Sequence, residues 1–313
     1  MRYRYADAHC DTAYEMLQKG CELDDNPLHI SLSQAGVFES YIQVFAAWTN
    51  DELTGAARAD AFFDIAENFR RQVSRNSDRI ALCLNGEDIA RALSQGKIAA
   101  IFAIEGGGAL NSDLSAIRRV FDAGVRMLTL TWNGQNELGF GQPEEGGLTD
   151  FGKKALRLME DAGILADVSH LSERGFWDVC ELARRPFLAS HSNLKSVCQH
   201  PRNITDEQFK ALVEAGGVCG INLCPLFLTG SSCADFESVE RHIYRFLELG
   251  GEKSVVMGAD FDGVTELPDG VSGLSSIPAL MEYLAGRGYP QALVDAIFFG
   301  NLKDFLLRTL TKS

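Results

Sequence analysis

Residues 164–191 read ILADVSHLSERGFWDVCELARRPFLASH, and this stretch decides the fold class of the chain. It begins with a buried-looking strand that ends at His170 and continues with a helix that starts at Ser172-Glu173. A second apolar strand then ends at His191. Strands that alternate with helices in this way are typical of a parallel sheet. The stretch therefore predicts consecutive βα units of an α/β fold.

The same alternation runs along the rest of the chain. Strands are expected near residues 3–9, 40–48, 98–105, 126–132, 164–170, 187–191, 217–223 and 254–260. Helices are expected near residues 54–75, 86–95, 112–122, 149–163, 172–183, 205–215, 235–249, 272–286, 290–299 and 301–310. N-cap signals mark four of the starts, at Ser112, Thr149, Ser172 and Thr205.

About eight strands joined by helices predict a (β/α)8 TIM-like barrel. We find no internal repeat, low-complexity tract or Pro-rich linker that would divide the chain. We therefore expect residues 1–313 to form a single catalytic barrel domain. Barrels of this kind reach such a length as one unit.

Composition excludes several classes of partner. Hydrophobic residues make up 46% and charged residues 23% of the 313 positions, which is enough for a large globular core. The formal net charge of −14 opposes binding to nucleic-acid phosphates and to anionic membranes. No apolar run approaches the length of a membrane span, and the first strand begins too early to leave room for a signal peptide. We expect a cytoplasmic protein that binds neither nucleic acid nor membrane.

The eight cysteines are dispersed and form no CxxC pair. Several lie in apolar runs such as residues 218–224, so buried, reduced thiols are expected, as in a cytoplasmic protein. Cys10 is the one cysteine next to candidate metal ligands. It would face away from His9 and Asp11 on an alternating strand, so we assign it no metal.

Histidines and carboxylates stand where several predicted strands end. These residues are His9, Asp11, Glu105, His170, His191 and Asp260. Functional side chains of (β/α)8 barrels collect at the carboxyl ends of the strands, so we expect these groups to converge. Imidazole and carboxylate are favoured ligands of zinc and similar divalent ions. The pattern therefore predicts a metal-dependent hydrolase.

Each candidate also has a purely structural interpretation. A single histidine at a strand end is more often a structural residue than a ligand, although several together argue against coincidence. Glu105 precedes three glycines, and it could be a solvated carboxylate before a flexible turn. Asp260 could be a ligand, a general base or a partner of a ligand. Asp262-Gly263 is interpreted as a turn, and His29 and His242 are assigned no role.

Arg202 follows the sixth predicted strand in the run His200-Pro201-Arg202-Asn203. A guanidinium group can hold a carboxylate through two parallel hydrogen bonds, so Arg202 is a candidate anion clamp. From composition alone, a surface ion pair is an equally good interpretation of this residue.

Eight short motifs occur in a specific order and spacing. They lie at residues 7–12, 105–107, 128–133, 147–152, 167–170, 190–192, 200–203 and 258–263. Together they resemble the membrane dipeptidase (renal dipeptidase) family of metallopeptidases, within the amidohydrolase-like barrels, over nearly the whole chain. The resemblance implies two divalent metal ions, with zinc preferred. It implies His9, Asp11 and Glu105 as ligands of one ion, and a bridging Glu105 with His170 and His191 as ligands of the other.

The resemblance also implies roles in substrate handling. Arg202 matches the arginine that holds the terminal carboxylate of the substrate, and Asp260 matches the aspartate that handles the proton. One departure concerns Trp132, which stands where family members with well-defined dipeptidase activity have a histidine near the scissile carbonyl. Tryptophan can stack or donate one hydrogen bond but cannot ionise or accept one. Trp132 is therefore a candidate substrate-binding residue, and it leaves the choice of substrate open.

The expected activity is hydrolysis of short peptides, dipeptides above all, by water activated between two metal ions. Substrates with a D-residue on the C-terminal side are included. An N-acyl amino acid deacylase on the same two-metal site is the first alternative, and a catalytically inactive metal-binding protein is the second. A small peptide is the expected partner, and the family resemblance hints at a homodimer.

Overall fold

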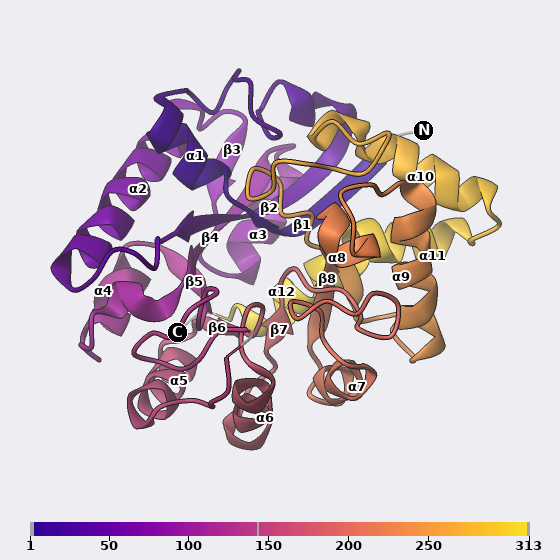
Figure 1. The fold of residues 1–313 in the computed structure, drawn as a ribbon. Coiled ribbons are helices and arrows are strands. Elements are labelled where there is room, and N and C mark those ends of the chain that lie inside the picture. Colours follow the sequence, from indigo (N-terminus) through magenta and orange to yellow (C-terminus); the bar gives the residue numbers. More distant parts are fainter. Residues whose placement is uncertain (1–2, 143, 312–313) are drawn as a thin grey trace.

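The computed structural model describes residues 3–142 and 144–311. Its centre is a closed barrel of parallel strands surrounded by helices (Figure 1). The barrel strands are β1 (Tyr3–Cys10), β2 (Phe38–Trp48), β4 (Ile98–Glu105), β5 (Val125–Thr129), β6 (Leu165–Asp167), β7 (Leu188–Ala189), β8 (Val218–Ile221) and β9 (Val255–Met257). They neighbour one another in the order β2-β1-β9-β8-β7-β6-β5-β4, and pairing of β2 with β4 closes the ring. The predicted TIM-like barrel is confirmed.

Helices follow most of the strands and cover the outside of the barrel (Figure 1). They are α1 (Thr12–Lys19), α2 (Ala56–Arg75), α3 (Gly86–Ser94), α4 (Ala116–Asp122), α5 (Asp150–Ala162), α6 (Glu173–Leu182), α7 (Asp206–Glu214), α8 (Pro225–Thr229), α9 (Phe236–Glu248), α10 (Ile277–Gly286), α11 (Gln291–Asp295) and α12 (Asn301–Thr309). The predicted caps Thr149, Ser172 and Thr205 each accept a hydrogen bond from a backbone N–H of the first helical turn.

The cap predicted at Ser112 is wrong. The helix begins later, at Ala116, because Asn111 and Ser112 adopt left-handed backbone angles, with φ of 50° and 55°. The short η2 turn (Gly107–Leu110) occupies the preceding residues. Two consecutive residues in this conformation cannot belong to a right-handed helix, and no residue pattern in this segment predicts them.

Several predicted strands end earlier in the structure, and some elements were missed. The strands predicted to reach His170 and Asp260 stop at Asp167 and Met257. The chain then turns through positive φ angles, 66° at His170 and 62° at Asp260. The missed elements are β3 (Ile80–Leu82), which pairs with the start of β4, and the short helices α1 and α8. A strand of three residues is too short to display an alternating pattern.

The core has two parts because successive strand residues face opposite sides. Small and branched residues of β4, namely Ala99, Ile101 and Ala103, join one buried cluster. Phe102 and Ile104 join a larger cluster together with residues of the surrounding helices. Glu105 continues the alternation of Ala99, Ile101 and Ala103, so the last residue of β4 is directed to the mouth of the barrel.

Among the described residues, no helix combines the length and the apolar character that crossing a membrane would require. All eight cysteines are free thiols, as predicted. Burial is less complete than predicted, since Cys21 and Cys180 are half-buried and Cys233 is exposed.

Candidate metal centre

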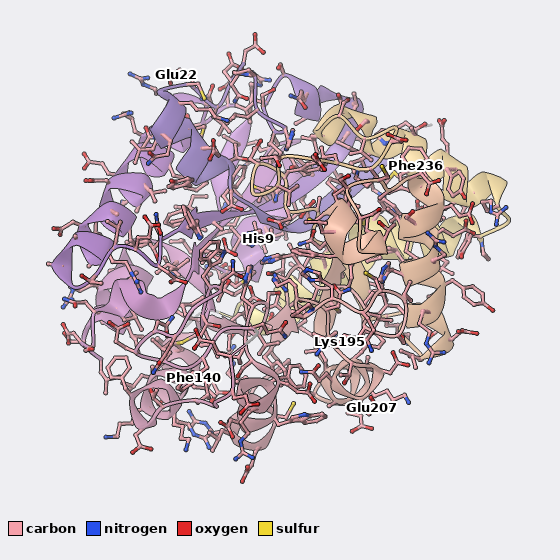
Figure 2. All side chains as sticks on the ribbon, in the orientation of Figure 1. His9, Glu22, Phe140, Lys195, Glu207 and Phe236 are labelled. Atoms are coloured by element: carbon pink, nitrogen blue, oxygen red, sulfur yellow. The ribbon has the colours of Figure 1, made fainter. Side chains whose placement is uncertain are left out.

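The residues predicted to form the site come together at the carboxyl ends of the barrel strands. His9 lies near the middle of the molecule, whereas Glu22 and Glu207 lie at its edges (Figure 2). His9 is the next-to-last residue of β1, and Glu105 is the last residue of β4. His170 and His191 follow the ends of β6 and β7. All four side chains are buried.

His9, Asp11 and Glu105 form the first group of potential ligands. His9 Nε2 lies 3.3 Å from Asp11 Oδ2 and 3.5 Å from Glu105 Oε2. Strand alternation predicted that His9 and Asp11 would share a face. They do meet, but Asp11 has already left the strand, because it is the N-cap residue of α1, with φ of −97°.

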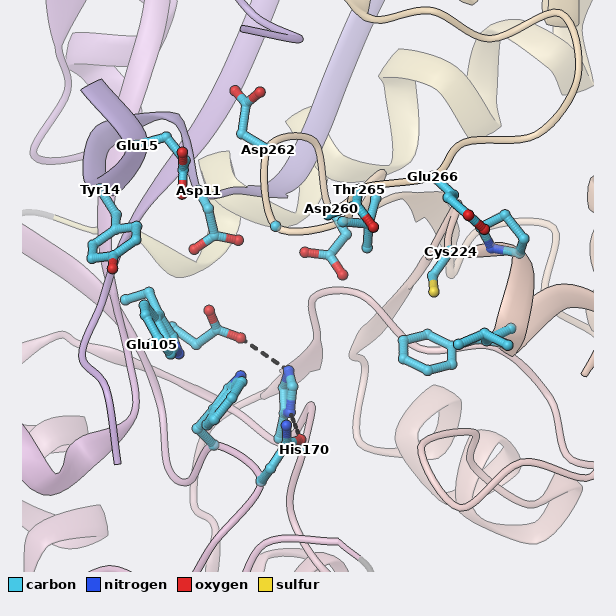
Figure 3. Close-up of a pocket in the computed structure, with 18 residues that line it drawn as sticks. Asp11, Tyr14, Glu15, Glu105, His170, Cys224, Asp260, Asp262, Thr265 and Glu266 are labelled. Atoms are coloured by element: carbon cyan, nitrogen blue, oxygen red, sulfur yellow. Dashed lines mark hydrogen bonds and ion pairs between the residues drawn. The ribbon is translucent and has the colours of Figure 1, made fainter. Parts of the chain in front are cut away.

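Glu105, His170 and His191 form the second group. Glu105 Oε1 lies 2.9 Å from His170 Nε2 and 3.5 Å from His191 Nε2 (Figure 3). Glu105 thus directs one carboxylate oxygen to each group, which is the geometry of a residue able to bridge two ions. Asp260 adjoins both groups, with its Oδ1 3.8 Å from His9 Nε2. Its Oδ2 accepts a hydrogen bond of 2.9 Å from the Asn222 side chain.

Hydrogen bonds orient the two imidazoles of the second group. His170 Nδ1 lies 2.9 Å from Asn133 Oδ1, which can only accept, so Nδ1 carries the proton. His191 Nδ1 lies 2.6 Å from the Ser190 hydroxyl, and that hydroxyl donates to Asp167. His191 Nδ1 is then also the protonated nitrogen. In both rings, Nε2 is left with a free lone pair directed at the site.

These lone pairs fit a cation. The Nε2 atoms of His170 and His191 lie only 3.0 Å apart, and both approach Glu105 Oε1. Asp11 Oδ1 is buried in the same region without a hydrogen-bond partner. Electron pairs placed this close repel one another unless a positive charge lies between them. Imidazole nitrogens and carboxylate oxygens in this number suit zinc or a similar divalent ion.

The protonation equilibria of the groups agree with this interpretation. Burial, followed by the charge of Arg202, lowers the pKa of His170, and burial and neighbouring positive charge lower the pKa of His191 well below its usual value. Although burial opposes it, Glu105 and Asp11 raise the pKa of His9 well above its usual value. These surroundings favour the protonated form of His9 in the absence of a metal ion. A divalent ion would displace that proton.

Carboxylate pKa values reflect the same crowding. Burial and the adjacent Glu105 raise the pKa of Asp11 well above its usual value. Burial also acts to raise the pKa of Glu105, but the charge of His9 and hydrogen bonds to the imidazoles hold that pKa well below its usual value. The surroundings of Glu105 thus favour its ionised form.

The backbone around the site is strained. Among the described residues other than glycine, five have positive φ angles, and three of them belong to this region: His170, Asp260 and Asp262. This conformation costs about 1 kcal/mol or more for each residue, and it concentrates at functional sites.

Arg202 is buried, so the interpretation as a surface ion pair is wrong. Its Nη1 donates to the Ser192 hydroxyl at 3.1 Å, and its Nη2 donates to the His191 carbonyl at 3.0 Å. Its Nε has no hydrogen-bond partner, and no described carboxylate lies within ion-pair distance of the guanidinium. Phe227 packs against it, with the ring centre 5.8 Å from the guanidinium carbon.

A cavity of about 430 Å³ lies beside the candidate ligands. Tyr14 and Cys224 lie on opposite sides of it (Figure 3). On the Tyr14 side, the Tyr14, Trp48 and Trp132 rings make successive edge-to-face contacts, with centroids 4.9 and 5.0 Å apart. We call these three residues the aromatic wall. The Cys224 side includes Cys224 and the residues that follow it, Pro225, Leu226 and Phe227, and Glu266 lies near Cys224 (Figure 3).

The lining of this cavity is acidic. Six carboxylate residues take part: Asp11, Glu15, Glu105, Asp260, Asp262 and Glu266. The lining contains neither lysine nor arginine, so Arg202 is not part of it. Glu15 is paired with Lys19 at 2.8 Å. The cavity is suited to a ligand with a positive charge.

Sequence reasoning missed the residues that orient the ligands. Asn133, Ser190 and Asn222 contact His170, His191 and Asp260, respectively. The available signal was a polar residue next to a strand-end histidine, as in Ser190-His191.

The turn interpretation of Asp262 is incomplete. Its buried carboxylate accepts hydrogen bonds from the Thr12 hydroxyl at 2.5 Å and from the backbone N–H of His29 at 2.6 Å. The backbone N–H of Asp262 donates to His29 Nδ1 at 3.0 Å. His29, to which the sequence assigned no role, thus ties the loop before β2 to the segment after β9. Asp262 fastens the start of α1 to the same segment.

The model of one protein family, described as membrane dipeptidase (peptidase family M19), matches residues 2–310. Among curated proteins, an uncharacterised protein encoded in the 5′ region of pqqA in Klebsiella pneumoniae is 33% identical over 244 residues. That match spans 74% of this chain and 90% of the relative.

Two solved structures are similar over essentially their whole lengths. One is a metallopeptidase from Rhodobacter sphaeroides bound to a phosphinate mimic of the dipeptide L-Ala-D-Ala, with 25% identity and a TM-score of 0.92 over 99% of this chain and 100% of that one. The other is described as dipeptidase AC, a metallopeptidase of family M19, with 26% identity and a TM-score of 0.93 over all of both chains.

Proposed function

The chain belongs to the membrane dipeptidase family, peptidase family M19, and from this premise we propose that it hydrolyses dipeptides with the help of two divalent metal ions. The observation that carries the proposal is Glu105, which directs one carboxylate oxygen to His9 and the other to His170 and His191. We propose zinc as the preferred ion, because the donors are imidazole nitrogens and carboxylate oxygens.

The proposed ligands are divided between the two groups. His9, Asp11 and Glu105 would hold one ion, and Glu105, His170 and His191 would hold the other. When bound, the two ions polarise the scissile carbonyl and make water a stronger acid and a better nucleophile. The inactive alternative is less well supported, because the donor set is complete and already oriented by Asn133 and Ser190.

Asp260 is the proposed acid and base. Its carboxylate lines the cavity next to both ligand groups, and Asn222 holds one of its oxygens at 2.9 Å. The other oxygen is free to take a proton from the attacking water and to return it to the leaving amine. The strained backbone at Asp260, with φ of 62°, is consistent with a side chain held where the reaction requires it.

Arg202 is the proposed partner of the substrate's terminal carboxylate. A buried guanidinium without a carboxylate within ion-pair distance has an unmet need for an anion, and its Nε–H is unpaired. Arg202 packs on Phe227, so the C-terminal residue of the substrate would lie on the Cys224–Phe227 side. The N-terminal residue would then extend to the aromatic wall.

Trp132 and the aromatic wall would therefore select the first side chain of the dipeptide. The wall offers aromatic surface of three rings and no charge next to His170 and Glu105. We propose a preference for bulky apolar or aromatic residues at the N-terminal position. The acidic lining favours a free ammonium group in the substrate, which an N-acyl amino acid lacks.

A substrate panel tests the proposal. The zinc-loaded protein is assayed with Phe-Ala, Phe-D-Ala, Gly-Ala and N-acetyl-phenylalanine. We expect turnover of the dipeptides, with D-Ala tolerated at the second position and Phe preferred to Gly at the first. Turnover of N-acetyl-phenylalanine with no turnover of any dipeptide would overturn the proposal in favour of a deacylase.

Two variants separate the roles of the substrate-binding residues. Arg202→Met should raise KM for all dipeptides by about 100-fold, because a charge-assisted pair is worth roughly 2–3 kcal/mol. Trp132→Ala should raise KM by about tenfold for Phe-Ala and much less for Gly-Ala. An unchanged KM in Arg202→Met would show that this residue is not the clamp.

A further inference from the structure

Two aspartates that take no part in the proposed reaction lie completely buried beneath the site. They are Asp7 in β1 and Asp167 in β6, each with 0% exposure. A buried carboxylate is costly unless hydrogen bonds satisfy its oxygens. In both side chains, one oxygen accepts hydrogen bonds from backbone N–H groups at or just beyond the ends of two neighbouring strands, and hydroxyl groups donate to the other oxygen.

Asp7 joins the end of β1 to the segment after β9. Its Oδ1 accepts hydrogen bonds from the backbone N–H of His9 at 3.0 Å and of Ala259 at 3.1 Å. The Tyr5 hydroxyl donates to Oδ2 at 2.5 Å. His9 is a proposed ligand, and Ala259 immediately precedes Asp260. The carboxylate thus fixes the backbone from which two site residues project.

Asp167 joins β6 and β7 in the same manner. Its Oδ1 accepts from the backbone N–H of Ser169 at 3.0 Å and of Ser190 at 2.9 Å. Its Oδ2 accepts from the Thr129 and Ser190 hydroxyls, both at 2.6 Å. Ser169 immediately precedes His170, and Ser190 immediately precedes His191. The carboxylate again lies under two site residues.

These contacts occur where the sheet is least well paired. The β1–β9 and β6–β7 ladders each have a single paired position within the described strands, and Asp7 and Asp167 are the residues at those positions. By comparison, the β2–β4 ladder has paired positions from Ile42 to Trp48. Between β1 and β9 and between β6 and β7, where the ladders are shortest, side-chain hydrogen bonds therefore replace ladder hydrogen bonds.

We propose that Asp7 and Asp167 are positioning residues, each of which holds one half of the two-metal site in a geometry ready for binding. Asp7 serves the half that contains His9, and Asp167 serves the half that contains His170 and His191. The inference rests on the proposed metal function. It deepens that function by assigning each buried carboxylate to one metal ion.

Asp167 has a second effect, through Ser190. Because the Ser190 hydroxyl donates to Asp167, its oxygen can only accept from His191 Nδ1. This chain of hydrogen bonds fixes the proton on Nδ1 and leaves Nε2 free for a metal ion. Among the described residues, Asp7 makes no hydrogen bond to an imidazole ring, and its contacts with the site residues are to backbone N–H groups.

Metal affinity of single-site variants tests the inference. Asp7→Asn and Asp167→Asn keep the shape of the side chain but replace one of its two accepting oxygens with an NH2 group, so the side chain can no longer accept hydrogen bonds at both positions. The metal-free proteins are titrated with Zn²⁺ against a chromophoric chelator, and bound Co²⁺ is followed by its visible spectrum. We expect a loss of about 10- to 100-fold in affinity for one ion in each variant.

The visible spectra of bound Co²⁺ distinguish the two proposed metal sites. Asp7→Asn should disturb the ion whose ligands include His9, and Asp167→Asn should disturb the ion held by two imidazoles. Asp178→Asn is the matched control. Asp178 is also a buried carboxylate that accepts a backbone hydrogen bond, from Leu148 at 2.8 Å, but it lies on α6 outside the site. The Asp178→Asn variant should bind both ions with the affinity of the wild type.

Ser190→Ala covers the case in which the aspartate variants fail to fold. It leaves the backbone contacts of Asp167 in place and removes the Ser190 hydroxyl that links Asp167 to His191. We expect it to weaken the second ion alone, by about tenfold. The inference is overturned if the wild type binds two ions and the folded variants bind them equally well. A wild type that binds fewer than two ions would instead refute the proposed two-metal function.

Discussion

The two sides of the barrel are built differently. On one side, β2 and β4 have 11 and 8 residues and pair along seven consecutive positions from Ile42 to Trp48. On the other, β6, β7 and β9 have three, two and three residues. The long ladder contributes Glu105, whereas the short strands release the chain early into the turns that carry His170, His191 and Asp260. Long ladders provide stability, and short strands provide freedom to place side chains.

The largest effect is expected at Glu105, which contacts candidate ligands from both sides of the barrel. Glu105→Ala removes the carboxylate that the two proposed ligand sets share, so the protein should lose affinity for both ions. Dipeptide hydrolysis should fall on the order of 10³-fold or more, because metal catalysis supplies several kcal/mol. Elemental analysis and steady-state kinetics measure the two losses. Glu240→Ala is the control, since Glu240 is also buried but contacts Tyr283 and Arg287 on the outer helices.

Stability should respond most on the side with the long ladder. Phe102 in β4 is fully buried, and its ring stacks on Phe69 at a centroid distance of 5.0 Å. Phe102→Ala should lower the free energy of unfolding by about 3–5 kcal/mol. Urea denaturation of the metal-free protein measures the change.

Leu188→Ala sharpens the contrast. Leu188 is buried in the two-residue strand β7, three residues before His191. Its loss should cost about 2–5 kcal/mol of stability and should also weaken metal binding. Phe102→Ala should leave metal affinity unchanged. Equal effects of the two variants on metal affinity would contradict the inference that the side with the long ladder provides stability and the side with the short strands positions the ligands.

A smaller effect depends on pH. His242 lies in α9, where its Nδ1 accepts from the Leu194 backbone at 3.2 Å and its Nε2 donates to the Leu228 carbonyl at 3.1 Å. Burial lowers the pKa of His242 to about 4, below the ordinary value of 6.5. The folded state thus favours the neutral ring. Its stabilisation is complete above pH 6.5 and is lost as the pH falls to 4.

The amount lost between pH 7 and pH 4 is about 3 kcal/mol. In His242→Gln this contribution should be absent, so the free energy of unfolding of the variant should fall less steeply with acid. Denaturant titrations of both metal-free proteins at the two pH values provide the measurement. Parallel decreases in the two proteins would show that His242 does not titrate on unfolding.

The barrel could be predicted from the sequence because it depends on patterns of many residues. Alternating strands and capped helices recur along the chain, and one wrong cap at Ser112 did not change the outcome. The position of Glu105 also follows from a pattern, since it continues the alternation of Ala99, Ile101 and Ala103. The role of each site residue as a ligand stays a prediction.

Local backbone geometry could not be predicted. Asp11 was expected to meet His9 by strand alternation, and it meets His9 from the cap of α1 instead. The positive φ angles at His170 and Asp260 depend on contacts between distant segments, which a single sequence does not display. The hydrogen bonds of Asp7 and Asp167 have the same origin, because their partners lie on neighbouring strands.

The left-handed backbone conformation at Asp260 has opposite consequences for thermal stability and for catalytic activity. Glycine would occupy that turn without conformational penalty, so Asp260→Gly should give a protein that withstands heat better and no longer turns over peptides. At this position, the residue that gives the higher thermal stability is therefore not the residue that supports catalysis.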